Sequence, residues 1–548
     1  MKALKIIGIV IAVLVVVAIA IPFFIDVNRF RPEIEQQISS TLGRQVKIGN
    51  LKLSILSGSV SADDLSIADD PAFSKKPFVS AKTLNVGVEL MPLIFSKQLH
   101  VTELVIDHPS VSLLRTDAGK WNFSSIGTKG AAPAPATAPA PAAKPKESAS
   151  ATPTGGSNPD LSVGKLSIKD GTVTLDNISN RAKPQVFPNV NITVQNFSFT
   201  SKFPFTMSAG LPGGGTAKLD GHAGPMDAND AALTALDAKI KVSNLDLAAS
   251  GFIDTASGIG GMVDFAGTVA SDGHQARSGG SATVNKIKLS PKGTPGSKAV
   301  DAKFATTYEL DKQSGQLTQG DVTIGKAVAH LTGRYQLTNT TTLNMKMSAS
   351  NMPVDDLTTM LGPLGVVLPS GSSLKGGTLS GDFTIVGPLD KLVINGPVKL
   401  ENTKLAGFDL GSKMSAISAL GGAKTGSDLT VQNLSTEAHV GPEGISTQNV
   451  NLNLPQLGVV TGSGTISPQN ALNYTMNAKL SGTMMSGISS VANMGGNNGI
   501  PFFIHGTTSD PKFEPDVKGM LKGQFAGVKQ NPQNLVNGLG GLFGKKKK

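Results

Sequence analysis

The sequence predicts a mainly β protein: an N-terminal transmembrane helix, then a long antiparallel curved β-sheet forming an elongated groove, with a few short helices. Three observations lead to this fold class. Sixty-three Gly and thirty-two Pro in 548 residues are too many for a helical protein. Apolar residues alternate with polar ones in short runs that end at Gly, Asn or Asp. One charge-free apolar run stands near the start.

The composition and charge of the chain limit which bonds can stabilise it and which partners it is expected to bind. No cysteine is present, so the chain has neither disulfides nor thiolate metal sites. The formal net charge is +10, but Lys and Arg are scattered, apart from the run Lys545 to Lys548. A nucleic-acid-binding protein concentrates its basic residues on one segment or face. We therefore expect no nucleic-acid partner.

The N-terminal segment predicts a membrane anchor. Residues 1–5 form a basic flank containing Lys2 and Lys5, and residues 6–25 carry no charge. Twenty helical residues rise about 30 Å, the thickness of the hydrocarbon core. Basic residues favour the cytoplasmic side, so the body of the chain is expected to be exported. The apolar positions assigned to the anchor are Ile6, Ile9, Val13, Val16, Ile19, Phe23 and Ile25.

A cleaved signal peptide is the alternative interpretation of this segment. Ala18, Ile19 and Ala20 match the small-residue pattern that signal peptidase cleaves. The apolar run continues beyond that pattern to Ile25 and is longer than a usual signal-peptide core. This length favours the uncleaved anchor.

Residues 26–127 are predicted to begin the exported body with one helix followed by strands. Pro32 suits the first turn of a helix, and Ile34, Ile38 and Leu42 recur at helical spacing before Gly43. We interpret this helix as a cap on the start of the sheet. Strands follow, two of them on either side of the turn Asp107-His108-Pro109, before a turn from Gly119 to Asn122 that contains the single Trp.

The rest of the chain divides into three parts by composition. Residues 128–159 consist largely of Ala, Pro, Ser and Thr and are predicted to be a linker without a core. Residues 160–525 return to the two-residue period and are predicted to be the main β-groove region, with a helical interruption from Val354 to Leu361. Residues 526–548 form a basic tail whose apolar residues and four lysines suit a membrane surface, although its glycines equally suit a disordered soluble tail.

A sheet with one apolar face must cover that face with a second sheet, with helices or with a ligand. Closed sandwiches and an open groove that holds acyl chains both satisfy this requirement, and alternation alone leaves both possible. Candidate positions for lining a groove are Leu84, Val86, Val88, Leu343, Met345, Met347, Leu472, Tyr474 and Met476.

No motif predicts catalysis, a cofactor or a metal site. The seven histidines lack the spacing that places two ligands on one helical face. The run Gly213 to Gly215 lacks the Lys-Ser/Thr pair of a phosphate-binding loop and is interpreted as a β-turn. The acidic pairs Asp63-Asp64, Asp69-Asp70 and Asp355-Asp356 are interpreted as solvated loop residues rather than cation ligands. We therefore expect no enzyme and no cofactor.

Four stretches resemble the AsmA family. The first is DVNRFRPEIEQQISSTLGRQVKIGNLKLSI at 26–55, in which a helix ends in Leu-Gly-Arg, and the second is VTELVIDHPSVSLLRTDAGKWNFSSI at 101–126, with its Gly-x-x-Asn turn. The others are SSLKGGTLSGDFTIVGPLDKLVINGPVKLENTKLAGFDL at 372–410 and IPFFIHGTTSDPKFEPDV at 500–517. Their order along the chain is similar to the order in that family.

The resemblance implies a single-pass protein of the bacterial inner membrane, with a cytoplasmic N-terminus and a periplasmic body. It further implies a β-groove related to chorein-type bridge-like lipid transfer proteins, and a role in moving or shielding phospholipid between the inner and outer membranes. Partners would be membrane lipids and envelope proteins of the outer membrane. The alternative is a periplasmic assembly factor for outer-membrane proteins that carries no lipid.

Overall fold

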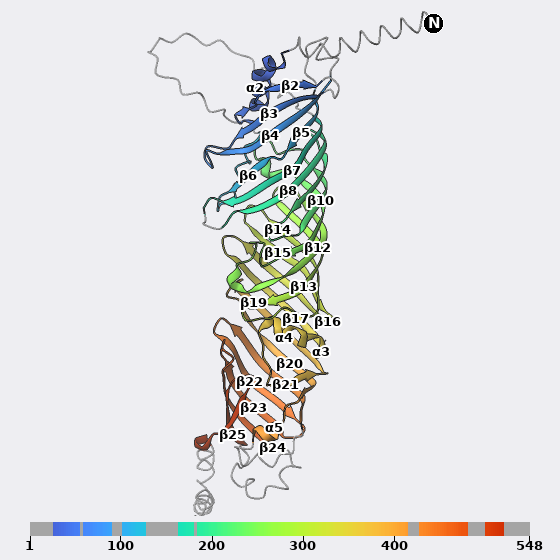
Figure 1. Cartoon of the computed structure of the whole chain (residues 1–548). Coiled ribbons are helices and arrows are strands. Elements are labelled where there is room, and N and C mark those ends of the chain that lie inside the picture. The colour runs from blue at the N-terminus through green and yellow to red at the C-terminus, as the bar shows by residue number, and fades with distance from the viewer. Residues whose placement is uncertain are drawn as a thin grey trace, which may run out of the picture. The chain divides into compact units, whose positions relative to one another are not determined.

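The computed structural model describes residues 26–54, 59–89, 101–127, 163–179, 183–414, 427–480 and 499–519 (Figure 1). The predicted anchor at 6–25, the linker at 128–159 and the tail at 526–548 lie outside the described residues. Within the described ranges, no helix combines the length and the apolar character needed to span a bilayer. The described part of the chain is mainly β-strand, as predicted.

The chain forms two compact units. Unit 1 comprises residues 1–252, 263–280 and 307–313, and unit 2 comprises residues 253–262, 281–306 and 314–548. Strands β12 (Ile259–Ser271), β13 (Gln275–Leu289) and β14 (Val300–Glu309) contribute residues to both.

The other elements of unit 1 are two short 3₁₀-helices, one α-helix and eleven strands in the described residues. They are η1 (Val27–Phe30), α2 (Arg31–Leu42), β1 (Val46–Lys47), β2 (Leu51–Ser54), β3 (Ser59–Ala68), β4 (Pro77–Val88), β5 (Val101–Asp107), β6 (Ser110–Arg115), β7 (Val163–Asn177), β8 (Gln185–Phe197), β9 (Phe203–Gly210), β10 (Thr216–Ala223), η3 (Ala231–Leu233) and β11 (Leu236–Asp246).

The other elements of unit 2 are mostly strands. They are η4 (Thr255–Ser257), β15 (Ser314–Ile324), β16 (Ala327–Leu337), β17 (Thr341–Pro353), α3 (Val354–Leu357), η5 (Thr358–Met360), α4 (Leu361–Leu364), β18 (Ser373–Lys375), β19 (Thr378–Pro388), β20 (Val393–Ala406), α5 (Leu410–Lys413), β21 (Asp428–Gly441), β22 (Gly444–Leu454), β23 (Gly458–Ile466), β24 (Leu472–Leu480), β25 (Ile500–Gly506) and β26 (Pro511–Pro515). The predicted helical interruption at Val354 is confirmed and extends to Leu364.

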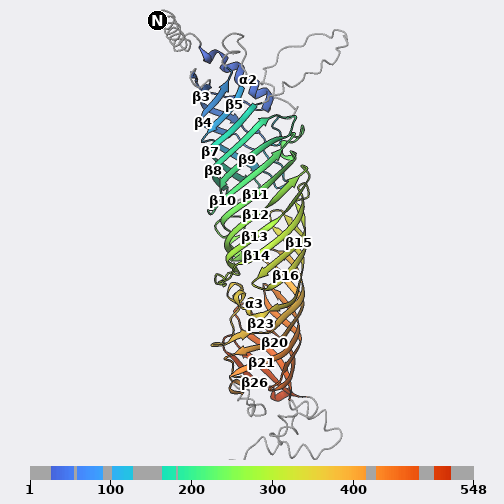
Figure 2. The same ribbon diagram turned by 90° about the vertical axis from the view of Figure 1, so that its right-hand side faces the viewer.

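Each unit builds a curved sheet in which consecutive strands pair antiparallel, so that β8, β9, β10 and β11 lie side by side in Figure 2. The sheet is antiparallel, as predicted, except that β5 and β6 both pair parallel with β7. Strands β5 and β6 run in the same direction, since both pair antiparallel with β4. Parallel neighbours need a long connection, and the long predicted linker stands between β6 and β7.

Helix α2 covers the first strands, as predicted. Its side chains Ile34, Ile38 and Leu42 pack against the buried cluster formed by the apolar residues of β1 to β4. Gly43 ends the helix in the left-handed conformation, with φ of 66°, and its N–H donates to the Ser39 carbonyl. The helix therefore closes one end of the apolar face of unit 1.

A buried polar cluster fixes this end. The Arg44 guanidinium donates to the carbonyl of Asn122 at 2.6 Å and lies 3.8 Å from the Asp69 carboxylate. The Asn122 amide donates to both Asp69 oxygens at 3.0 Å and accepts from the Leu114 N–H. Asn122 and the Asp69 side chain have no solvent exposure, so the interpretation of Asp69 as a solvated loop residue is wrong. Arg44 of the Leu-Gly-Arg motif and Asn122 of the Gly-x-x-Asn turn meet here, and both contact the buried Asp69 carboxylate.

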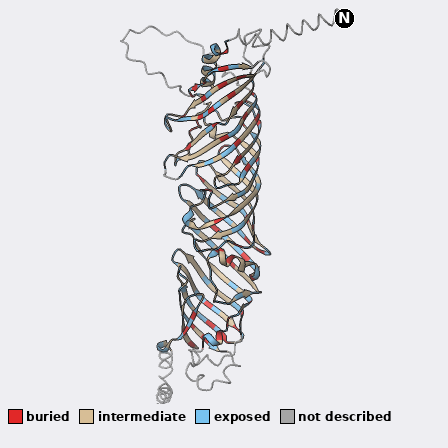
Figure 3. Cartoon of the chain, in the orientation of Figure 1, coloured by how far each residue is buried: buried red, intermediate tan, exposed pale blue. Residues whose placement is uncertain are grey.

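The strands of each unit belong to one ladder. Among the described residues, each strand pairs with its neighbours in that ladder and no second sheet is present. Figure 3 shows buried residues concentrated near α2, α3 and α5, while residues of intermediate exposure dominate the strands between these helices. Of the two arrangements that alternation permits, each unit therefore adopts the single curved layer.

We predict that Asn122→Ala destabilises unit 1. The substitution removes the two hydrogen bonds of the Asn122 amide to the buried Asp69 carboxylate and leaves the Leu114 N–H without its partner, which costs about 2–3 kcal/mol. Trp121, the single Trp, neighbours the site and reports its unfolding by fluorescence during urea denaturation.

Asn177→Ala is the matched control, because Asn177 is also in unit 1 but donates its hydrogen bond to Asp117 at the surface. Its expected effect is within about 0.5 kcal/mol. Equal midpoints for the two variants would contradict a structural role of the buried cluster.

Candidate functional site

The register of unit 1 aligns apolar side chains on one face of the sheet. Directly paired residues in neighbouring strands point to the same face. Following the pairs from β2 to β11 gives one residue on each of nine strands, which we call the unit 1 apolar row: Leu51, Ala62, Leu84, Ile106, Ile168, Ile192, Met207, Leu219 and Ile240.

Unit 2 repeats the arrangement with different strands. Its pairs define a second set across β15, β16, β17 and β19 to β24, which we call the unit 2 apolar row: Leu317, Gly333, Met345, Ile385, Ile394, Val440, Ile445, Ile466 and Leu472. Eight intervals of about 4.8 Å give this row a length of roughly 38 Å across the strands.

The opposite face is polar at the same strands. One residue away from the unit 2 apolar row, the paired residues are Thr332, Lys346, Thr384, Asn395, His439, Ser446, Thr465 and Asn473. At these positions one face of the unit 2 sheet is apolar and the other is polar, and the polar face suits water.

Much of each apolar row is accessible. In unit 1, Leu84 lies under α2 and is 2% exposed, whereas every member from Ile106 to Ile240 keeps intermediate exposure. In unit 2, Met345 is buried and the other members are of intermediate exposure. A covered apolar face of this size would be almost fully buried, so these rows are free to contact an apolar ligand.

A short helix covers the C-terminal part of the apolar face. Leu410 and Met414, in and beside α5, pack with Met476, Ala478 and Phe502 in one buried cluster. Helix α5 lies between β20 and β21, and the Lys413 ammonium reaches the Asp510 carboxylate, in the turn between β25 and β26, at 3.0 Å. This ion pair holds the pKa of Asp510 below its ordinary value. The segment after β20 is thus linked to the last two strands of unit 2.

The segment between β17 and β18 makes a second link. Ser370 donates its N–H to the Ser509 carbonyl, in the turn between β25 and β26, at 2.9 Å. Leu357 of α3 packs on the apolar face beside Ala349 and Met352. We call residues 354–372 the crossing segment.

Both carboxylates of the acidic pair Asp355-Asp356 accept hydrogen bonds that hold the crossing segment in place. Asp356 accepts from the Lys298 ammonium at 2.7 Å and from the Lys326 N–H at 2.8 Å, and Asp355 accepts from the Gly376 N–H. The side chain of Asp356 is only 14% exposed, so the interpretation of Asp356 as solvated is wrong, whereas Asp355 is exposed as expected. Hydrogen bonding by Lys298, followed by that of the Lys326 N–H, lowers the pKa of Asp356.

The structure places the predicted lining residues on the apolar faces of both units. Leu84, Met345 and Leu472 belong to the apolar rows themselves. The others stand two or four residues along the same strands, on the same face: Val86, Leu343, Met347, Tyr474 and Met476. The side chain of Val88 lies outside the described residues. Leu84, Met345 and Met476 are buried by protein contacts, so the half-exposed members are better placed to meet a ligand.

Sequence reasoning missed members that the register reveals. Ile394, Val440, Ile445 and Ile466 complete the unit 2 row, and they alternate with polar residues as the predicted lining residues do. Alternation identifies the residues that share a face within one strand, but only the pairing shows which of them continue a row into the next strand.

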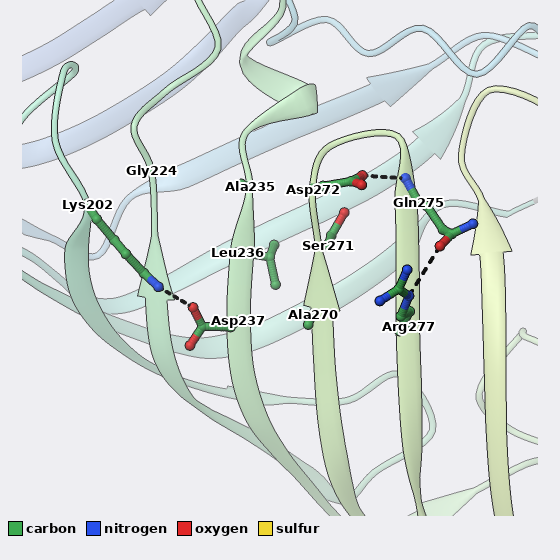
Figure 4. Close-up of a pocket in the computed structure, with 10 residues that line it drawn as sticks. All are labelled: Lys202, Gly224, Ala235, Leu236, Asp237, Ala270, Ser271, Asp272, Gln275 and Arg277. Carbon is green, nitrogen blue, oxygen red and sulfur yellow. Dashed lines mark hydrogen bonds and ion pairs between the residues drawn. The ribbon is translucent and has the colours of Figure 1, made fainter.

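A surface pocket of about 320 Å³ lies at one edge of unit 1 (Figure 4). Figure 4 shows Lys202 directed at Asp237 and Arg277 beside Gln275, with nitrogen–oxygen distances of 2.5 Å and 3.2 Å. Hydrogen bonding by Lys202 lowers the pKa of Asp237. Asp237 pairs with His222 and alternates with the apolar-face residue Ala238, so it stands on the polar face. The pocket is therefore separate from the apolar rows, and its Lys202 and Asp237 neutralise each other.

The glycine run and the histidines considered in the sequence analysis have structural roles. Gly213 to Gly215 lie in the turn between β9 and β10, as predicted. His330 and His439 contact Asp321 and Glu443 at the surface. In the described ranges, no group of three or more potential ligands is arranged to hold a metal ion.

Comparison with known proteins identifies one family. The model of the AsmA family matches residues 1–292, which is more than half of the 548 residues. No curated protein and no solved structure matches the chain.

The lowered pKa of Asp356 predicts a pH-dependent contribution to stability. A carboxyl group whose pKa is lower in the folded state stabilises that state above its ordinary value of 3.8, and this contribution is lost as the pH falls through the lowered value. The stability difference between the wild type and Asp356→Asn should thus be constant from neutral pH to about pH 5 and shrink below about pH 4. Urea midpoints from circular dichroism measure it.

Asp382→Asn is the control, because Asp382 is exposed on the polar face of β19. It should leave the midpoint almost unchanged at every pH. A difference for Asp356→Asn that persisted undiminished at pH 3 would exclude the Lys298 contact as its source.

Proposed function

The chain belongs to the AsmA family, and on that premise we propose that it binds phospholipid acyl chains on its apolar rows and moves or shields phospholipid between the inner and outer membranes. In this way it contributes to the assembly and integrity of the outer membrane. The observation that supports this proposal is that, in each unit, most residues of the apolar row, which has one residue on each of nine strands, keep intermediate exposure.

The energetics favour an acyl chain as the occupant. Each methylene group that leaves water for an apolar surface gains about 0.8 kcal/mol, and this gain needs no fixed geometry. A row of Ile, Leu, Val and Met across successive strands offers the same contact at each step. A ligand therefore shifts along the row without breaking a specific polar contact, and no covalent step is required.

The proposal includes a location. Residues 6–25 anchor the protein in the bacterial inner membrane, with residues 1–5 in the cytoplasm and the body in the periplasm. The apolar rows then function like the β-groove of bridge-like lipid transfer proteins. Membrane lipids are the principal partners under this proposal, and envelope proteins of the outer membrane are the secondary ones.

A second candidate is an assembly factor for outer-membrane proteins that carries no lipid. One separate observation favours it. Leu364, Val366 and Val367 in the crossing segment are 48%, 38% and 46% exposed. Adjacent exposed apolar side chains of this kind suit a protein contact.

Site-specific photocrosslinking in the full-length protein in its native membrane distinguishes the two. A photoreactive residue in place of Ile394, on the apolar face, should capture phospholipid, which mass spectrometry of the adduct identifies. The same residue in place of Asn395, its neighbour on the polar face, should capture little. Phospholipid at Ile394 in amounts no greater than at Asn395, with protein adducts instead, would support the assembly factor.

Charge on the apolar row should block transfer. Ile385→Lys with Ile394→Lys places two ammonium groups where acyl chains would lie, and should reduce lipid capture at Ile445 by about tenfold or more.

Thr384→Lys with Asn395→Lys adds the same charge to the polar face of the same two strands and should leave capture unchanged. Protease resistance of both variants, measured in parallel, checks that they remain folded. If both variants captured lipid equally well, the apolar row would not be the binding surface.

A further inference from the structure

Tyr474 lies flat against the sheet instead of projecting from it. Tyr474 on β24 is paired with Gly464 on β23, which is paired with Thr447 on β22. The Tyr474 hydroxyl is 3.1 Å from the Thr447 hydroxyl, two strands away. The ring therefore crosses over Gly464, where a Cβ atom would overlap the ring carbon atoms. Burial raises the pKa of the Tyr474 hydroxyl, which keeps it protonated.

Tyr335 makes the same arrangement elsewhere in unit 2. Tyr335 on β16 is paired with Gly315 on β15, and its hydroxyl is 2.8 Å from that of Thr306 on β14. The three atoms nearest to a Cβ at Gly315 all belong to the Tyr335 side chain. The chain has three tyrosines, and two of them thus lie over a glycine with the hydroxyl on a threonine two strands away.

The Tyr474 ring closes a row of small residues. Pairing connects Gly396, Ala438, Thr447 and Gly464, one on each strand from β20 to β23, and then Tyr474. All five residues have intermediate exposure. The unit 2 apolar row runs along one side of this small-residue row, with Ile394, Val440, Ile445 and Ile466.

On the other side of the small-residue row, the next residues on the same face are Val398, Thr436, Val450 and Gly462. A row of large apolar residues follows one same-face position further, nearer the opposite strand ends: Leu400, Leu434, Leu452 and Val460. The small-residue row is thus a low strip of the sheet that has large apolar side chains on both sides.

We propose that this strip is the track of a single acyl chain, and that Gly464 and Thr447 position the Tyr474 ring as part of its floor. The inference rests on the proposed function, which it refines by giving the chain a path. Four intervals of about 4.8 Å from β20 to β24 give the strip roughly 19 Å. One leaflet contributes about half of the 30 Å hydrocarbon core, so the strip accommodates one extended lipid chain.

The threonine and the glycine have separate parts in this arrangement. A phenol buried against an apolar surface needs a hydrogen-bond partner, and Thr447 supplies it within the plane of the sheet. Glycine provides the clearance, because any side chain at 464 would displace the ring. The displaced ring would rise into the space that the acyl chain occupies. The Tyr335 ring lies over Gly315 with its hydroxyl against Thr306, so the same contacts position a second tyrosine ring against the sheet.

Gly464→Ala in the full-length protein tests the proposal. With a photoreactive residue at Ile445, beside the strip, lipid capture should fall about tenfold, because the ring rises into the track. Capture at Ile192, in the unit 1 apolar row, should not change. Adding Tyr474→Ala to Gly464→Ala should restore capture at Ile445 to within about twofold of the wild type, because it removes the ring.

Gly315→Ala repeats the test at Tyr335, with lipid capture measured by a photoreactive residue at Leu317. Ser463→Ala, on the polar face of β23, is the control and should leave lipid capture unchanged. Undiminished capture in both glycine variants would overturn the proposal, as would a loss that removal of the ring does not relieve. An equal loss at Ile192 would overturn it too, because the effect would then be general unfolding. Absence of lipid from every apolar position of the unsubstituted protein would instead contradict the proposed function.

Discussion

Strand register is the constraint on which the rest of this structure depends. Side chains alternate with a period of two, so a slip of one residue at any strand would send an apolar set to the polar face. The pairing keeps nine apolar residues aligned in each unit. Where β22 carries an extra residue between Thr447 and Val450, a bulge absorbs it, and both residues remain paired with the glycines of one face of β23. Aligned apolar rows are therefore a property of the whole ladder.

The covered ends explain how a single-layer sheet with one apolar face remains stable in water. Helix α2 buries the first strands of unit 1, and α5 buries the last strands of unit 2. Polar contacts secure these covers: Arg44 and Asn122 near α2, and the Lys413–Asp510 pair at α5. Within each unit, most members of the apolar row outside these covers keep intermediate exposure, and under the proposed function a lipid would cover them.

The apolar surface also differs from a usual hydrophobic core in its profile. Cores interdigitate large side chains to fill space. Here glycine, alanine and threonine form a strip between larger aliphatic residues, and Tyr474 lies flat over Gly464. Such a surface leaves space above its small side chains. This surface favours a ligand that moves along the sheet over a protein partner that binds at one place. In this respect the apolar strip differs from the exposed apolar residues near α4, which suit a protein contact.

The sequence by itself determined the β class, the capping helix that ends at Gly43, the helical interruption at Val354 and the family, because these depend on local periodicity, on termination signals and on motifs. It also indicated which residues of a strand share a face. Only the tertiary structure decided the parallel pairing of β5 and β6 with β7, the burial of Asp69 by Arg44 and Asn122, and the anchoring of Asp356 by Lys298. It alone aligned Gly464 beneath Tyr474. These contacts join residues distant in sequence, and local patterns carry no information about which strands become neighbours.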